Sequence, residues 1–128
     1  MVYRECWAQG NEANEPMKIY CDSSTTEYCL VLEGREPQVV TYPAPVTNNV
    51  GEYQAVIEAI KLALSLKLKD ALILTDSQLV VEQVNGMWKC RQPHLLPLRD
   101  KARELLKGSS ITLTWTPREN NLAGKVLE

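Results

Sequence analysis

Three acidic residues stand where elements of secondary structure are expected to begin or end. Asp22 and Asp76 each follow a short apolar run, and Glu52 opens a stretch with helical periodicity. Neighbouring strands of one sheet would bring the three carboxylates together at its edge. Carboxylate oxygens are the ligands that hard divalent cations prefer. The spacing therefore predicts a divalent-metal site that acts on phosphate.

Three strands are predicted before the first helix. Apolar and β-branched residues gather in three short runs, 17–21, 27–32 and 38–42, with polar turns between them. Short turns favour an antiparallel meander. Pro43 and Pro45 are expected to end it.

Helices and strands then alternate. Asn48 or Asn49 is expected to cap a helix whose apolar residues recur from Tyr53 to Leu64, and the run 71–75 predicts a central strand. A strand–helix–strand passage favours parallel pairing with an earlier strand. The rest is predicted as a helix over 77–84, a helix that begins at Pro97 and ends before Gly108, a half-buried strand with Ile111, Leu113 and Trp115 on one face, and a last helix from Asn120 or Asn121.

The length of 128 residues and the 45% content of hydrophobic residues fit one globular domain. Residues 1–16 lack periodicity, so we expect a leader or loosely attached tail before a domain at 17–128. No apolar run reaches the roughly 18 residues of a membrane span, and the first residues lack the apolar core of a secretion signal. We expect a cytoplasmic monomer with no membrane association.

The cysteines do not suggest a zinc site. Cys6, Cys21, Cys29 and Cys90 form no Cys-x-x-Cys pair, and one histidine, His94, cannot complete a zinc cluster. A hairpin centred on Thr25 would make Cys21 and Cys29 cross-strand neighbours, which permits a disulfide without requiring one. We interpret both as core residues in a reducing compartment.

A formal net charge of -2 argues against binding nucleic acid through bulk positive charge. Any affinity must be local, and the candidate cluster is Trp88, Lys89 and Arg91, helped by basic residues at 101, 103 and 107. The alternative is a solvated helix end.

The order of these elements and acids resembles the ribonuclease H family over 17–128. Three motifs carry the resemblance: Thr47-Asn48-Asn49-Val50-Gly51-Glu52-Tyr53-Gln54-Ala55 at the helix start, Thr75-Asp76-Ser77-Gln78 after the fourth strand, and Trp115-Thr116-Pro117-Arg118-Glu119-Asn120 near the end. It implies an α/β fold with a five-stranded mixed sheet, three antiparallel strands and then two parallel ones, flanked by helices.

The resemblance also implies an activity, the hydrolysis of the RNA strand in RNA/DNA hybrids. Two Mg²⁺ or Mn²⁺ ions about 4 Å apart can activate water and stabilise the leaving oxygen. By similarity, Asp22 bridges the ions while Glu52 and Asp76 each add a ligand. Asn49 and Gln78 match residues that contact the minor groove, and their amides suit the 2′-hydroxyl that distinguishes RNA from DNA.

The chain departs from the family pattern at several positions. Gly124 stands where the family has a fourth acid, and Asn121 or Glu128 could share its helix face and offer an oxygen instead. The turn 23–26 lacks the glycine that usually follows the first aspartate. The family's basic protrusion is also absent, so Trp88, Lys89 and Arg91 would have to contact the nucleic acid in its place.

The histidine often found before the last helix is also absent. Arg118 stands near its place and is expected to contact substrate, while His94 is interpreted as an ordinary loop or helix-start residue. Two alternatives stay open. One is a non-catalytic module that binds nucleic acid or a protein partner, and the other keeps the metal site but acts on branched or single-stranded DNA.

Overall fold

The computed structural model describes residues 16–128 and contains five strands, four α-helices and a short 3-10 helix within that range. In chain order these are β1 (Lys18–Ser23), β2 (Glu27–Leu32), β3 (Gln38–Thr41), α1 (Asn48–Ser65), β4 (Leu72–Thr75), α2 (Gln78–Val84), α3 (Leu96–Leu106), β5 (Thr112–Trp115), η1 (Arg118–Asn120) and α4 (Leu122–Leu127). The leader predicted at 1–16 lies, apart from Pro16, outside the described residues. Over 16–128, no helix combines the length and apolar character that a membrane span requires.

The five strands form one mixed sheet in the order β3-β2-β1-β4-β5. β1 pairs with β2, and β2 with β3, in antiparallel fashion, whereas β1–β4 and β4–β5 are parallel pairs. The predicted fold class, with its antiparallel meander and parallel central strand, is therefore confirmed. The parallel pairs place the ends of β1 and β4, and so the residues that follow them, at the same edge of the sheet.

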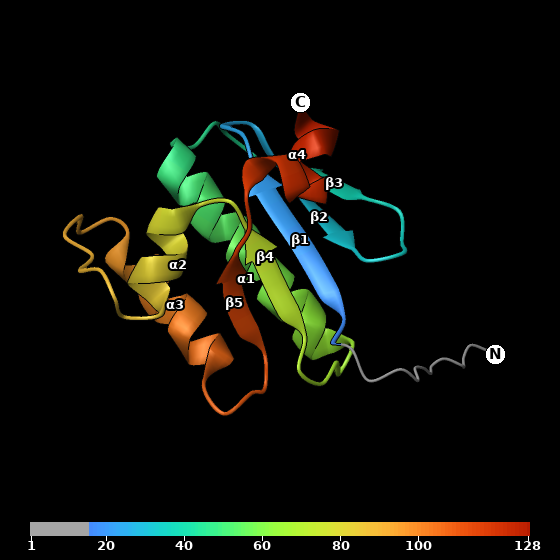
Figure 1. Ribbon diagram of the computed structural model, residues 1–128. Coiled ribbons are helices and arrows are strands. Elements are labelled where there is room, and N and C mark those ends of the chain that lie inside the picture. The colour runs from blue at the N-terminus through green and yellow to red at the C-terminus, as the bar shows by residue number, and fades with distance from the viewer. Residues whose placement is uncertain (1–15) are drawn as a thin grey trace.

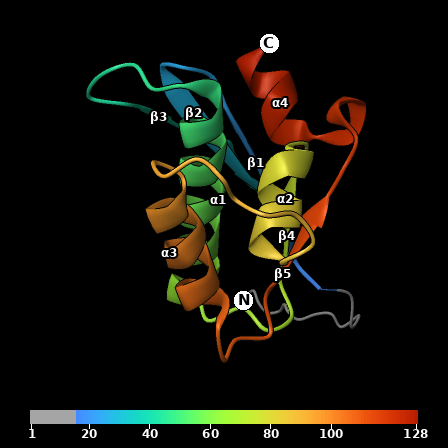
Figure 2. The same ribbon diagram turned by 90° about the vertical axis from the view of Figure 1, so that its left-hand side faces the viewer.

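The helices cover the two faces of the sheet unequally. Figure 2 shows α1 and α3 on one side of the sheet and α4 on the other. The main core lies on the α1 side, where Ile19 and Ile73 of the sheet meet Val56, Ile60 and their neighbours in α1. A smaller cluster on the other face joins Cys29 and Val31 to Ala123 of α4. Figure 1 shows α4 lying across the sheet near the end of β1, the strand that contains Asp22.

The β1–β2 hairpin differs by one residue from the expected register. Cys21 pairs with Leu30, and Asp22 pairs with Cys29, so the two cysteines are not cross-strand neighbours. A shift of one residue reverses the face to which a side chain points, and the thiols accordingly lie in the two different core clusters. Both are free and buried, and burial raises the pKa of both thiols. Their interpretation as core residues is confirmed.

Two local expectations were wrong. Thr47, not Asn48 or Asn49, caps α1, because its side chain accepts a hydrogen bond from the backbone N–H of Val50. Trp115 is 47% exposed although it shares the alternation of the buried Ile111 and Leu113. It ends an edge strand that has a neighbour on only one side, so periodicity alone overestimated its burial.

A close contact fixes the start of α1 against the β1–β2 turn. The Ser23 hydroxyl lies 2.7 Å from the hydroxyl of Tyr42, which donates to the Gly51 carbonyl at 3.2 Å. A Cβ at Gly51 would overlap the Ser23 hydroxyl and lie 3.1 Å from the Ser24 carbonyl. Glycine is therefore required for the helix to approach this turn, and the contact holds the next residue, Glu52, near the end of β1.

We expect Gly51→Ala to destabilise the protein by about 1–3 kcal/mol, because the overpacked turn must shift, even though alanine favours helices. The measurement is the midpoint of urea unfolding. Gly124→Ala is the matched control, since a Cβ there meets its nearest atom at an ordinary 3.5 Å. A Gly51→Ala protein as stable as the wild type would contradict this account of the turn.

Candidate metal centre

The structure brings the three predicted acids together. Asp22 lies in β1, Glu52 in the first turns of α1, and Asp76 directly after β4. One carboxylate oxygen from each lies within 4.8 Å of the others. The parallel β1–β4 pair aligns the two aspartates, and the close turn at Gly51 brings the glutamate to them. Three segments far apart in the sequence thus converge on one point.

The oxygen atoms of this cluster suit a hard cation. Asp22 is only 2% exposed. Its Oδ1 and the Oε1 of Glu52 are buried without a hydrogen-bond donor in the described part of the chain. Buried polar atoms are ordinarily paired, and an unpaired carboxylate costs free energy unless a cation or proton satisfies it. The residues present therefore fit a divalent ion such as Mg²⁺ or Mn²⁺, which binds oxygen ligands.

Without a cation, Glu52 and Asp22 hold protons more tightly than free carboxylates do. Burial raises the pKa of Glu52 to about 8, and the charges of Asp22 and Asp76 add to the rise. Burial also raises the pKa of Asp22 to about 6, with a further contribution from Asp76, while the Arg118 guanidinium opposes both shifts. Burial and the mutual repulsion of the acids both disfavour the ionised carboxylates, so positive charge at this site would stabilise them.

Asn121 supports the cluster as a hydrogen-bond donor. Its side-chain nitrogen donates to Asp76 Oδ2 at 2.9 Å and to the Cys21 carbonyl at 3.0 Å. Its oxygen accepts from the backbone N–H of Ala123 at 3.1 Å and caps α4. In this orientation the Asn121 side chain turns its nitrogen, and not the expected oxygen ligand, toward Asp76. Glu128 is exposed, and its assignment as a ligand stays a prediction.

Arg118 reaches the cluster from the segment between β5 and α4. Its Nη1 lies 3.4 Å from Asp76 Oδ2 and 3.8 Å from Asp22 Oδ1. The side chain is 59% exposed, so the guanidinium also faces solvent. A planar group with five donors can contact a carboxylate and a phosphate at once. Arg118 is thus placed to contact a bound anion beside the carboxylates.

Gly124 borders the same carboxylates. A Cβ added at this position would lie 3.5 Å from Asp22 Oδ2 and 3.7 Å from Asp76 Oδ2. A longer side chain at 124 would therefore start at the cluster. Position 124 thus lies beside the cluster, and its glycine offers no carboxylate on this side.

Two exposed amides flank the acids. Asn49 lies in the first turn of α1, three residues before Glu52, and Gln78 begins α2, two residues after Asp76. Both side chains are exposed. Their positions at helix starts beside the cluster leave them free to contact a ligand held there, although a role for either in binding stays a prediction.

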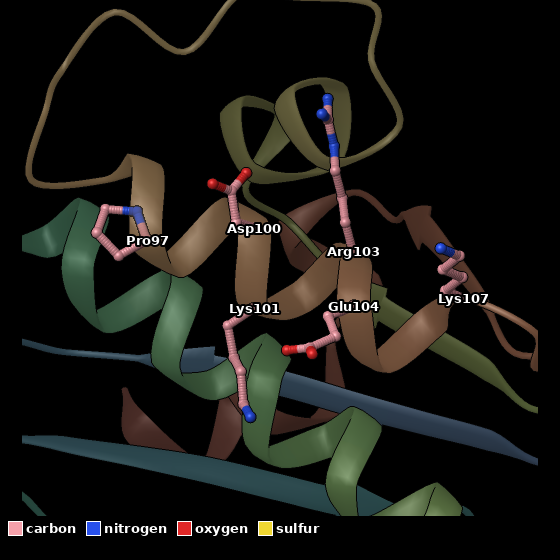
Figure 3. Close-up of a pocket in the computed structure, with 6 residues that line it drawn as sticks. All are labelled: Pro97, Asp100, Lys101, Arg103, Glu104 and Lys107. Carbon is pink, nitrogen blue, oxygen red and sulfur yellow. The ribbon is translucent and has the colours of Figure 1, made fainter.

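The basic and aromatic candidates lie apart from the acids. Trp88 and Lys89 are exposed in the connection between α2 and α3. This connection extends at the left-hand side of the molecule in Figure 1. Arg103, expected to help them, is occupied, because its guanidinium donates to the carbonyls of Gln83 and Val84 at the end of α2. Figure 3 shows Arg103 on α3 beside an open hollow that is also lined by Pro97, Asp100, Lys101, Glu104 and Lys107. This hollow includes none of the clustered acids.

Two contributions to the site were not predicted from the sequence. The hydrogen bond from Asn121 to Asp76 was not expected, because an asparagine before a helix is equally well explained as a cap. The hydrogen bond between the hydroxyls of Ser23 and Tyr42, which fixes the start of α1 against the β1–β2 turn, was not expected either. The signal for the second was Gly51 itself, a glycine inside a helix directly before an acid, which often marks a close backbone approach.

Comparison with known proteins places this geometry in a family. A family model described as reverse transcriptase-like matches residues 37–127. A ribonuclease HI of Halobacterium salinarum is 41% identical over 76 residues, which are 59% of this chain and 38% of that protein. A bifunctional protein of Mycobacterium tuberculosis is 42% identical over 76 residues, but this match spans only 21% of its length.

Solved structures match more of the chain. The ribonuclease H1 of Halobacterium salinarum has a TM-score of 0.74 at 30% identity and covers 88% of this chain and 94% of its own. The N-terminal ribonuclease H domain of the Mycobacterium tuberculosis protein has a TM-score of 0.68 at 32% identity, covering 82% and 84%. LC11-RNase H1, solved in complex with an RNA/DNA hybrid, shares the fold with a TM-score of 0.71 at 23% identity, covering 88% and 99%.

Proposed function

Because the chain belongs to the ribonuclease H family, we propose that it is a metal-dependent endonuclease that hydrolyses the RNA strand of RNA/DNA hybrids. The observation that carries the proposal is the convergence of the carboxylates of Asp22, Glu52 and Asp76 within 4.8 Å, with one buried oxygen each of Asp22 and Glu52 that lacks a hydrogen-bond donor in the described part of the chain. Family membership alone would not distinguish an active enzyme from a binding module. The expected cytoplasmic location and monomeric state stay predictions.

The three acids are the proposed ligands of Mg²⁺ or Mn²⁺. When bound, a divalent cation activates the attacking water and stabilises the charge that develops on the phosphate oxygens. Asp22 is held in a sheet strand and Asp76 by the Asn121 amide, so both carboxylates are oriented in advance. The expectation of two ions came from the resemblance, and in this chain it depends on position 124, which carries no acid.

Substrate choice is proposed to depend on the exposed amides. Asn49 and Gln78 stand at two helix starts next to the acids, and each can both donate and accept hydrogen bonds. Contacts to 2′-hydroxyls in the minor groove would select the strand that contains ribose. Arg118 would contact the phosphate, and Trp88 and Lys89 would contact the duplex further along. LC11-RNase H1, which was solved with an RNA/DNA hybrid, shares the fold of this chain.

The competing proposal is a non-catalytic module that keeps the binding surface. Gly124 favours it, because the family's fourth acid is absent. The buried oxygens of Asp22 and Glu52 that accept no hydrogen bond favour the enzyme, because a site no longer in use has no reason to retain this electrostatic cost.

The experiment that tests the proposed substrate compares end-labelled RNA/DNA hybrid, duplex RNA, duplex DNA and single-stranded DNA of one sequence, with Mg²⁺ or Mn²⁺. We expect cleavage of the RNA strand in the hybrid alone, and none in EDTA. The double variant Asn49→Ala/Gln78→Ala should lower kcat/KM for the hybrid by about tenfold or more, because the lost hydrogen bonds should cost about 1–3 kcal/mol of transition-state stabilisation. Gln54→Ala, on the same helix, is the control. Preferential cleavage of DNA would refute the proposed substrate.

A further inference from the structure

The cluster differs from a site with four carboxylates in its charge as well as in its ligands. Three carboxylates face one another, and one guanidinium lies within 3.8 Å of two of them. If all of these groups are ionised, two negative charges remain. One divalent cation balances that charge, whereas a fourth carboxylate would leave an excess that favours a second cation.

The place of the missing acid is defined by the backbone. Position 124 approaches Asp22 Oδ2 and Asp76 Oδ2 as closely as an ordinary van der Waals contact allows. No residue of α4, Leu122–Leu127, has a side-chain oxygen, and its N-cap, Asn121, presents a nitrogen to Asp76. This side of the cluster therefore supplies a donor and no further oxygen ligand from α4.

Arg118 supplies positive charge at the cluster. Its Nη1 contacts the two aspartates that border position 124, at 3.4 Å and 3.8 Å. These distances are those of an ion pair, and the exposed remainder of the guanidinium is available to a phosphate. A fixed cation so close to the carboxylates opposes the approach of a second metal ion.

We propose that this chain binds one divalent cation between Asp22, Glu52 and Asp76, and that Arg118 provides the second positive charge at the bound phosphate. The inference rests on the proposed function, because the phosphate is that of the proposed hybrid substrate. It identifies Arg118 as a phosphate-contacting catalytic residue. It also accounts for the absence of an acid at position 124, since a carboxylate there would be needed only to hold a second ion.

The test is the stoichiometry of Mn²⁺ binding, measured by calorimetry on the EDTA-stripped protein without substrate. We expect one ion per chain for the wild type and for Gly124→Asn, and two for Gly124→Asp. Gly124→Asn matches the aspartate in size but not in charge, and a Cβ at 124 meets no atom closer than 3.5 Å. Circular dichroism and thermal unfolding establish that each variant is folded.

Arg118 is tested in two backgrounds. In the wild type, Arg118→Ala should tighten Mn²⁺ binding several-fold, because a repelling charge is lost, and should lower hybrid cleavage by about tenfold or more. Arg118→Lys should retain most of both properties. In the Gly124→Asp background, the same Arg118→Ala change should cost less cleavage, because a second ion supplies the charge.

The outcomes separate this inference from the proposed function. Two Mn²⁺ ions of comparable affinity on the wild-type protein would overturn the single-ion site even if the hybrid is cut. One ion without hybrid cleavage would overturn the proposed function and leave the ion count standing. Equal losses from Arg118→Ala in both backgrounds would overturn the assigned role of Arg118.

Discussion

Replacing Asp22 by asparagine is expected to lower hybrid cleavage by about 10³-fold or more while making the metal-free protein more stable. The carboxylate is 2% exposed and faces two other acids. Its neutral isostere would weaken the cation that the chemistry requires, and the loss of one preorganised charge in such a site commonly costs this much. Removing a buried charge from mutual repulsion should add about 1–3 kcal/mol to the free energy of unfolding at pH 8 in EDTA.

Single-turnover cleavage in saturating Mg²⁺ and urea unfolding in EDTA measure the two effects. Asp100→Asn, an exposed acid of α3 paired with Arg99, is the control for loss of an acid elsewhere and should leave both nearly unchanged. Cleavage by Asp22→Asn within tenfold of the wild type would rule out Asp22 as a metal ligand.

The second large effect is a loss of stability with rising pH that divalent cations reverse. The pKa of Glu52 is raised from 4.5 to about 8, chiefly by burial. The native state therefore binds more protons than the unfolded chain between these values. The contribution of Glu52 to the free energy of unfolding is therefore most favourable below pH 4.5. It falls by at most about 1.4 kcal/mol per pH unit until the pH passes about 8. Asp22, with a pKa raised to about 6, acts in the same direction at lower pH.

Thermal unfolding in EDTA from pH 5 to pH 9 should thus show a falling midpoint, and Mn²⁺ should restore it most strongly at the alkaline end, because it binds the ionised native site. Glu52→Gln should flatten the dependence above pH 6. Glu58→Gln, which removes a surface acid paired with Lys61 on the same helix, should not. A midpoint that stays constant from pH 5 to pH 9 without metal would contradict the description of a strained carboxylate cluster.

The placement of the three acids could be predicted because it depends on strong local signals. Apolar runs that end in Asp22 and Asp76 specify strand ends, and parallel pairing of those strands brings them together. Glu52 follows from helix periodicity after the capping segment. Each of these signals involves few residues. The order of the strands and helices along the chain excludes most other sheet topologies.

The details that could not be predicted depend on contacts between distant segments. The register of the β1–β2 hairpin differs by one residue from the expected register, because a turn of four polar residues does not fix its own centre. Cys21 and Cys29 are therefore not paired across the two strands. Thr47 caps α1 although two asparagines follow it, since several residue types compete for that position. The donor role of Asn121 required knowing that a residue 45 positions earlier, Asp76, lies beside it.

The most direct test of the metal-dependent nuclease measures binding and cutting of one labelled RNA/DNA hybrid together, across a Mg²⁺ titration, with Asp76→Asn beside the wild type. RNA cleavage by the wild type is expected to rise and saturate with Mg²⁺, and Asp76→Asn is expected to bind the hybrid without cutting it. Tight binding by the wild type with no cleavage at any concentration of Mg²⁺ or Mn²⁺ would contradict the account and identify the chain as a non-catalytic binding module.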